Sequence, residues 1–131
     1  MYPDEINKDN LKVGDVVGVR YPTQIGWGYF RYPKTFATVI TRITPARNKF
    51  VTEKFGGMGK SDPIYKITPE NNWQTTVALH AQDITARLQK LDNIRSSDGL
   101  NRLSDTAIVN LSKLLAECVK EMESDLEEGS G

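Results

Sequence analysis

The chain has 131 residues, no formal net charge at pH 7 and 38% hydrophobic residues. This length suits one compact domain, or a small domain with an added element. Such a chain can bury a core without disulfides or metal ions to hold it together. A single cysteine excludes an internal disulfide, and no apolar run approaches the about 20 residues that a membrane helix needs. The polar N-terminus, MYPDEINKDN, does not have the pattern of a signal peptide. We therefore expect a cytoplasmic protein with no membrane partner.

Charge and aromatic residues are distributed unevenly along the chain. Residues 1–69 hold 11 Lys and Arg against six Asp and Glu, whereas residues 70–131 hold six against 11. All aromatic residues lie between Tyr2 and Trp73. Because the two halves differ in chemistry, we expect a basic, aromatic-rich domain over residues 1–79, an acidic two-helix region over residues 80–128 and a flexible tail over residues 129–131.

The first region has the pattern of short β-strands. Residues 16–20 form a short apolar run after a Gly-Asp pair, and residues 36–55 alternate β-branched and polar residues around a Pro-Ala-Arg-Asn turn, which predicts a hairpin. The segment FGGMGKSDP predicts a glycine-rich loop. Residues 64–68 and residues 73–79 are candidates for two further strands. Several short strands at close spacing favour a small barrel or sandwich.

The second region has the pattern of two helices, because its apolar residues recur at spacings of three and four. The first helix is expected from about residue 80 to 94, ended by SSDG at residues 96–99, and Ser104 is expected to cap the second. The second helix either lies on the barrel or forms a helical hairpin or coiled coil that joins chains into a homo-oligomer. The candidate oligomer interface follows heptad spacing: Ile108, Leu111, Leu115, Cys118 and Met122.

Residue types that support catalysis are scarce. The only histidine, His80, excludes a metal site built on several histidines, and Cys118 occupies a position typical of a buried thiol. GMGKS at residues 57–61 is similar to the end of a phosphate-binding P-loop, but Lys54 stands where its first glycine belongs and Asp-Pro follows where a helix must start. We therefore expect a non-enzymatic protein without a metal or cofactor. The loop backbone beside Lys60 is either an anion-binding nest or an ordinary mobile loop.

Residues 26–33, GWGYFRYP, concentrate four aromatic rings and an arginine. In an extended chain Tyr29 and Arg31 face one way, and Phe30 and Tyr32 face the other, so one pair would join the core and the other a surface. Basic residues interleaved with rings are typical of proteins that bind single strands or nucleotides, although rings also fill the core of a small barrel. The candidate ligand-binding residues are Trp27, Tyr29, Arg31, Lys34, Arg42, Arg47, Lys49 and Lys60.

The segments LKVGDVVGV, ATVITRITPARNKFVTE and YKI resemble small SH3-like β-barrel domains, which typically open with a Gly-Asp-x-Val strand and continue through a β-hairpin. Similar barrels are common in uncharacterised bacteriophage and mobile-element proteins. The resemblance covers roughly residues 11–68; the aromatic insert at residues 21–35 and the helical half depart from it. With the predicted helices, the expected fold class is α+β: an N-terminal small SH3-like antiparallel β-barrel followed by two C-terminal helices. No functional residues follow, because such barrels bind peptides, nucleic acids and proteins alike.

Two functions fit these patterns. The first is a non-enzymatic binding module of phage or bacterial origin, in which a basic aromatic barrel face binds nucleic acid or a nucleotide-type anion and the helices oligomerise. The alternative is a phage-encoded inhibitor of a host defence protein, or a sponge for a nucleotide signal, acting in the host cytoplasm. Its acidic helix end would either mimic nucleic acid or dock on a basic partner, and it carries Glu117, Glu121, Glu123, Asp125, Glu127 and Glu128.

Overall fold

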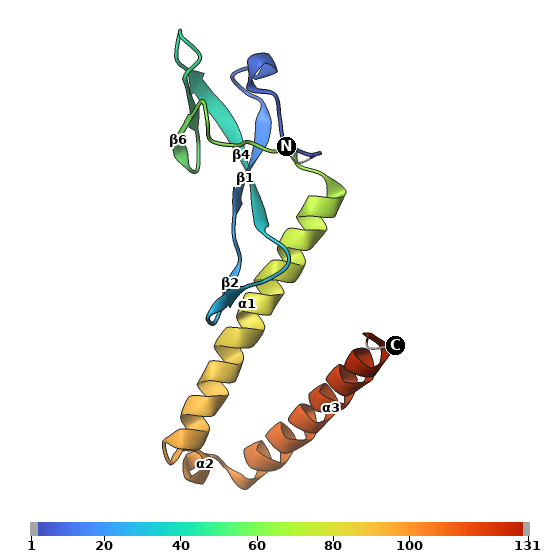
Figure 1. Cartoon of the computed structure of the whole chain (residues 1–131). Helices are drawn as coiled ribbons and strands as arrows, with labels where there is room; N and C mark the ends of the chain where they lie inside the picture. Colours follow the sequence, from blue (N-terminus) through green and yellow to red (C-terminus); the bar gives the residue numbers. More distant parts are fainter. Residues whose placement is uncertain (1–2, 130–131) are drawn as a thin grey trace. The chain divides into compact units, whose positions relative to one another are not determined.

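The computed structural model describes residues 3–129 and has an α+β fold, in which an antiparallel sheet precedes the helices (Figure 1). Its contacts divide the chain into two compact units, residues 1–86 and residues 87–131. The first unit holds every strand of the described chain and the first part of the long helix α1. The predicted order of an antiparallel sheet followed by two long helices is confirmed.

The main sheet is curled and has four antiparallel strands in the order β1-β4-β5-β6. These are β1 (Val16–Tyr21), β4 (Lys34–Ile43), β5 (Lys49–Thr52) and β6 (Gly56–Gly59). A second, two-stranded sheet pairs β2 (Gln24–Ile25) with β3 (Gly28–Tyr29), and the 3-10 helix η1 (Lys8–Asn10) precedes β1. The first strand and the hairpin within residues 36–55 are confirmed, but residues 56–59 form a strand instead of a glycine-rich loop.

The strand predicted at residues 64–68 is reduced to two isolated bridges, through which Tyr65 pairs with Glu5 and with Gly18. The Gly18 amide donates to the Tyr65 carbonyl at 2.6 Å, and the Tyr65 amide donates back at 2.9 Å. A Cβ atom at Gly18 would lie 2.6 Å from Thr35 Cγ2. This close approach requires glycine in the middle of β1. The segment that contains Tyr65 can therefore pack directly against the sheet.

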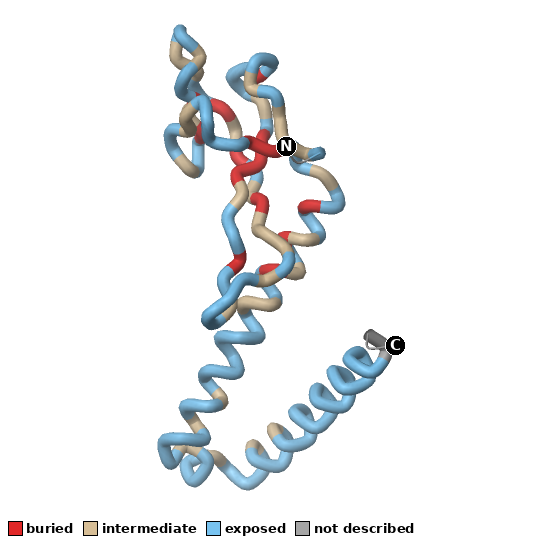
Figure 2. The backbone as a smooth tube through the Cα atoms, in the orientation of Figure 1, coloured by how far each residue is buried: buried red, intermediate tan, exposed pale blue. Residues whose placement is uncertain are grey.

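A bulge in β4 sets which side chains enter the core. Strict alternation would place Arg42 on the same face as the buried Ile40, but the pairing with β5 shifts between these residues. Arg42 is therefore exposed, and Ile43 packs against the core in its place. The core lies in the first unit, and Figure 2 shows the buried residues gathered there. It consists of Leu11, Val17, Ile40, Phe50 and Ile64.

Helix α1 (Pro69–Ser96) begins about ten residues earlier than predicted, so the strand proposed at residues 73–79 is wrong. A reciprocal cap starts the helix: the Asn71 amide donates to Thr68 Oγ1, and the Thr68 amide donates to Asn71 Oδ1, both at 3.0 Å. Pro69 occupies the first helical position, where its missing amide hydrogen costs nothing. These local bonds fix the helix start beside the sheet.

The first part of α1 packs against the strands largely through polar side chains. Thr75 Oγ1 accepts from the Thr35 amide at 2.8 Å and donates to the Asn71 carbonyl at 2.8 Å. Gln82 accepts from Lys34 Nζ at 3.1 Å and donates to the Gln24 carbonyl at 3.1 Å. These bonds hold α1 along the edge of β4 and beside the small sheet.

The second unit contains the end of α1, the short helix α2 (Gly99–Arg102) and the long helix α3 (Asp105–Gly129). The predicted break at residues 96–99 is confirmed, and so is the cap, because Ser104 Oγ accepts from the Ala107 amide at 3.2 Å. Within residues 3–129, no helix carries an apolar stretch long enough to cross a bilayer.

Candidate ligand-binding cavity

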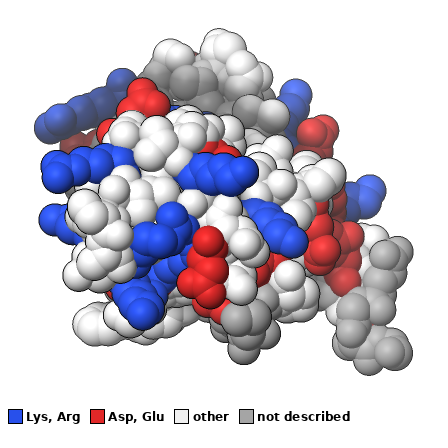
Figure 3. Space-filling model, turned by 90° about the horizontal axis from the view of Figure 1, so that it is seen from above, with Lys and Arg blue, Asp and Glu red and all other residues white. Residues whose placement is uncertain are grey.

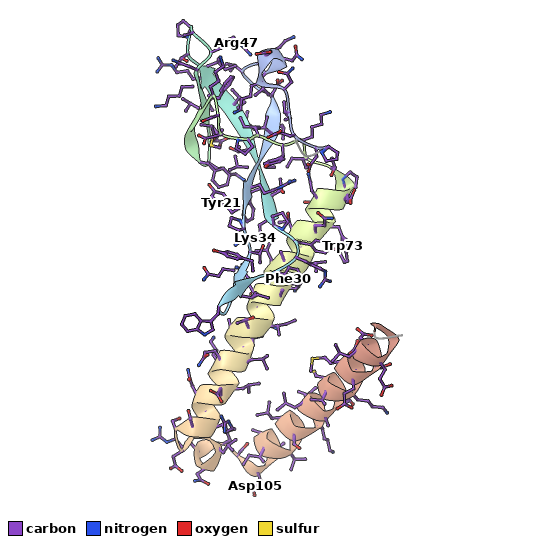
Figure 4. All side chains as sticks on the ribbon, in the orientation of Figure 1. Tyr21, Phe30, Lys34, Arg47, Trp73 and Asp105 are labelled. Atoms are coloured by element: carbon purple, nitrogen blue, oxygen red, sulfur yellow. The ribbon has the colours of Figure 1, made fainter. Side chains whose placement is uncertain are left out.

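The structure distributes the eight candidate ligand-binding residues over different parts of the first unit. Tyr29 and Arg31 line one cavity, and Arg47 and Lys60 line another, smaller one. Figure 4 shows Arg47 at the end of the main sheet remote from Phe30 and Lys34. The eight residues therefore do not form one surface.

The larger cavity, called the Arg31 cavity below, has a volume of about 860 Å³. This lies within the range of about 300–1,000 Å³ that is common for small-ligand sites. Its walls come from the N-terminal segment, the end of β1, the chain around β3, the segment that bridges to β1, and the first turns of α1. The lining residues are Pro3, Asp4, Arg20, Pro22, Thr23, Tyr29, Phe30, Arg31, Tyr32, Pro33, Tyr65, Lys66, Thr68, Glu70, Asn71 and Gln74.

Aromatic rings and a guanidinium group form one wall of this cavity. Phe30 and Tyr32 meet edge to face, with ring centroids 5.8 Å apart. The Arg31 guanidinium carbon lies 4.8 Å from the Phe30 centroid and 5.0 Å from the Tyr32 centroid. The side chain of Tyr29 is 70% exposed. Tyr29 and Arg31 are thus the exposed pair, whereas Phe30 and Tyr32 are half-buried and line the cavity instead of joining the core.

Arg20 forms a second cationic group at the cavity, and its position is fixed by three described residues. Its guanidinium lies 3.7 Å above the Tyr65 ring, its Nε donates to Thr35 Oγ1 at 2.9 Å, and its Nη2 pairs with the Asp4 carboxylate. Because Asp4 neutralises this guanidinium, the unneutralised charges of the lining belong to Arg31, Lys66 and Glu70. The lining carries one net positive charge.

Asp4 joins the N-terminal segment to both the sheet and α1. Asn71 Nδ2 donates to Asp4 Oδ2 at 3.1 Å and to the Lys66 carbonyl at 2.7 Å. Burial tends to raise the pKa of Asp4, but the hydrogen bonds from Arg20 and Asn71 and the positive charge of Arg20 hold it below its ordinary value of 3.8. The ionised carboxylate is therefore part of the folded cavity wall.

This pKa predicts an acid-sensitive first unit. Because the folded-state pKa lies below the unfolded value, the carboxylate stabilises the fold above about pH 4, and this contribution is lost as the pH falls through the folded-state pKa. We expect Asp4→Asn to lower the free energy of unfolding at pH 7 by about 1–2 kcal/mol. At pH 3, the free energy of unfolding of the variant should approach that of the wild type. Urea unfolding monitored by near-ultraviolet circular dichroism measures this, because all aromatic residues lie in the first unit.

Asp83→Asn is the matched control, because Asp83 is exposed on α1 and forms no hydrogen bond through its side chain among the described residues. It should leave the pH dependence unchanged. If the free energy of unfolding of Asp4→Asn changed with pH in parallel with that of the wild type from pH 3 to pH 7, the stabilising role of the Asp4 carboxylate would be contradicted.

Thr23 lines the cavity, and its hydroxyl group is buried. The residue is 1% exposed, and its Oγ1 has no hydrogen-bond partner among residues 3–129. Its carbonyl accepts from the Phe30 amide at 2.8 Å, which ties it to the aromatic wall. A buried hydroxyl without a partner is uncommon in folded proteins, because its desolvation is not offset by a hydrogen bond.

The smaller cavity, of about 380 Å³, is built around interactions that hold the N-terminal segment in place. Arg47 Nη2 donates to the carbonyls of Lys8, Asp9 and Leu11, and Lys8 Nζ donates to the carbonyls of Gly59 and Lys60. Burial lowers the pKa of Lys8 below 10.5, while the nearby carboxylates of Asp62 and Glu5 act to raise it. Ligand binding by Arg47 stays a prediction, because carbonyl groups already engage this guanidinium.

The remaining candidates lie outside both cavities. Trp27 is fully exposed in the two-residue turn between β2 and β3, beside Gly26, whose φ of 59° favours glycine. Lys34 is bonded to Gln82, Arg42 is exposed on β4, and the Lys49 side chain lies across Gly57 of β6. Lys and Arg side chains are prominent on the face seen from the end that carries the β4–β5 turn (Figure 3). Within residues 3–129, no group of His, Cys, Asp and Glu side chains is placed to hold a metal ion.

Sequence reasoning missed Asp4, Arg20, Thr23 and Asn71 at the cavity. Asp4 lies 67 residues from Asn71 along the chain, so no local pattern connects them. One signal was present: Thr68-Pro69-Glu70 is a typical helix start, and it would have placed the beginning of α1 near the strands.

No protein-family model, curated protein or solved structure matches the chain. The resemblance to SH3-like barrels therefore stays a prediction, and the function is inferred from the cavity.

Proposed function

We propose that the first unit is a non-enzymatic binding module that holds a nucleotide-type anion in the Arg31 cavity. The observation that carries this proposal is the position of the Arg31 guanidinium over the rings of Phe30 and Tyr32 in a cavity of about 860 Å³. Rings at such a wall stack on a base, and an arginine beside them meets a phosphate. The curled sheet supports the further proposal of an SH3-like barrel. We also propose, from the sequence resemblance alone, that the protein is of phage or bacterial origin.

The ligand is either a free nucleotide or one unit of a single-stranded nucleic acid, since both present a base and a phosphate. Tyr29 and the fully exposed Trp27 stand near one another on the β2–β3 hairpin and its turn, where a longer strand could continue. A protein that sequesters a nucleotide signal would use the same cavity, so that alternative shares this site. In either form, the helices are proposed to join copies of the chain.

The proposal is tested by measuring the affinity of the wild-type protein for two probes, ATP and a fluorescein-labelled dT12 oligonucleotide, at 50 and 200 mM NaCl. We expect the dissociation constant of at least one probe to rise with salt, because phosphate contacts release counterions. Tighter binding of ATP would identify a free nucleotide as the ligand, and tighter binding of dT12 would identify a strand.

Dissociation constants above 1 mM for both probes at 50 mM NaCl would overturn the proposal. Tight binding that does not change with salt would also count against it, since the phosphate would then make no contact with the cationic side chains. The isolated bases adenine and thymine provide the control, because they carry no phosphate and should show no salt dependence.

A further inference from the structure

One side of α3 carries an apolar stripe along most of its length. At about 100° per residue, these residues lie on one side of the helix: Ile108, Leu111, Leu115, Cys118, Val119 and Met122. All except the half-buried Leu111 are exposed in the described structure, and Figure 2 shows α3 as mostly exposed. A monomeric protein rarely exposes a continuous apolar surface of this kind, so the stripe indicates an interaction surface.

Charge is segregated along the same helix. In residues 105–114, Lys113 balances Asp105, whereas residues 115–128 hold six acidic residues against Lys120. Two parallel copies of α3 would place their acidic ends together. Two antiparallel copies would instead place each acidic end beside the start of the other helix, where the helix dipole favours negative charge. The charge pattern therefore makes α3 complementary to a second, antiparallel copy of itself.

The heptad spacing provides a register for this pairing. When two antiparallel helices overlap over nearly their whole length, Leu111 lies opposite Met122 of the second copy, and Leu115 lies opposite Cys118. Each pair then matches a branched leucine with a flexible methionine or a small cysteine, and the charged residues Lys113 and Lys120 lie on the far side of the helix.

We infer that α3 packs antiparallel against α3 of a second copy of this chain, with Leu111 opposite Met122 and Leu115 opposite Cys118. The inference rests on the proposed role of the helices in oligomerisation and gives it an orientation and a register. It is independent of the Arg31 cavity.

Disulfide trapping in the full chain tests the orientation. The variant combines Leu111→Cys and Met122→Cys with Cys118→Ala, and is oxidised and then digested with trypsin, which cleaves after Lys113 and Lys120. The two cysteines then fall in separate peptides. Within one helix, positions 111 and 122 are about 16 Å apart, beyond the about 7 Å between Cα atoms that a disulfide spans, so a link between them joins two chains.

We expect links between positions 111 and 122 to exceed like-with-like links at least tenfold. Predominant 111–111 and 122–122 links would show parallel helices and overturn the inference, as would the absence of links. The control pairs Lys113→Cys with Lys120→Cys in the Cys118→Ala chain. In the antiparallel pair these positions lie opposite one another along the helix axis but on the far side of each helix, so they should not link on a non-reducing gel.

Native mass spectrometry of the wild type should show a dimer; a monomer would overturn oligomerisation itself, whatever the result for ligand binding.

Discussion

Replacing Phe50 with alanine is expected to lower the free energy of unfolding of the first unit by about 3–5 kcal/mol. Phe50 is 1% exposed and packs with Leu11, Val17, Ile40 and Ile64 at the centre of the core. Truncation removes the apolar contacts of the ring and leaves a cavity that the surrounding strands can fill only in part. Because small domains are stable by about 5–15 kcal/mol, this single change removes a large share of the stability. Urea unfolding followed by near-ultraviolet circular dichroism measures the loss.

Tyr29→Ala is the matched control for Phe50→Ala. It also removes an aromatic ring, but Tyr29 is mostly exposed, so the free energy of unfolding should change by no more than about 0.5 kcal/mol. A loss below about 1 kcal/mol for Phe50→Ala would contradict the assignment of Phe50 to the core.

Replacing Arg31 with alanine is expected to weaken binding of the better probe, ATP or dT12, by about tenfold or more, because a charge-assisted contact to phosphate is lost. The slope of affinity against salt should fall by about one unit, since one phosphate contact is removed. Arg31 forms no ion pair among the described residues, but its contacts with the Phe30 and Tyr32 rings are lost, so the free energy of unfolding should fall by about 0.5–1 kcal/mol. Fluorescence anisotropy and calorimetry measure the affinity.

Arg42→Ala is the control that distinguishes a local contact of Arg31 with the ligand from the effect of the overall positive charge on affinity. It removes the same charge, but Arg42 is exposed on β4 and lines neither cavity. We expect affinity to change by less than about twofold, because the site is distant and screened by salt. Equal losses for Arg31→Ala and Arg42→Ala would show that binding depends on the diffuse charge of the domain and not on the Arg31 cavity.

The sequence predicted the elements whose signals are local. The β-branched run of β4, the turn after it and the Ser104 cap are each defined within a few residues, and each is present. The alternation of Trp73, Thr75, Val77 and Leu79 was misleading, because over so few residues a strand pattern can also occur in a helix. This segment forms a helix because the Thr68–Asn71 cap starts α1, and because Thr75 and Ala78 then lie on the buried side of the helix.

The candidate site was only partly predictable. The alternation of GWGYFRYP indicated that Tyr29 and Arg31 would share one face, and both are exposed and line the cavity. The opposite wall depends on contacts between distant segments, such as Arg20 with Asp4 and Asp4 with Asn71. The several basic residues near the β4–β5 turn looked equivalent to Arg31 in the sequence, and only the fold shows that they lie at another end of the sheet.

Nucleotide binding in the Arg31 cavity is tested by a titration of the isotope-labelled protein with ATP, followed through its backbone amide NMR signals. We expect the largest shifts at residues 29–32, with smaller shifts at Arg20, Tyr65 and Asn71, which line the same cavity. Largest shifts at Arg42, Arg47, Lys49 and Lys60, or no shifts at millimolar ATP together with no shifts for dT12, would contradict a nucleotide site in the Arg31 cavity.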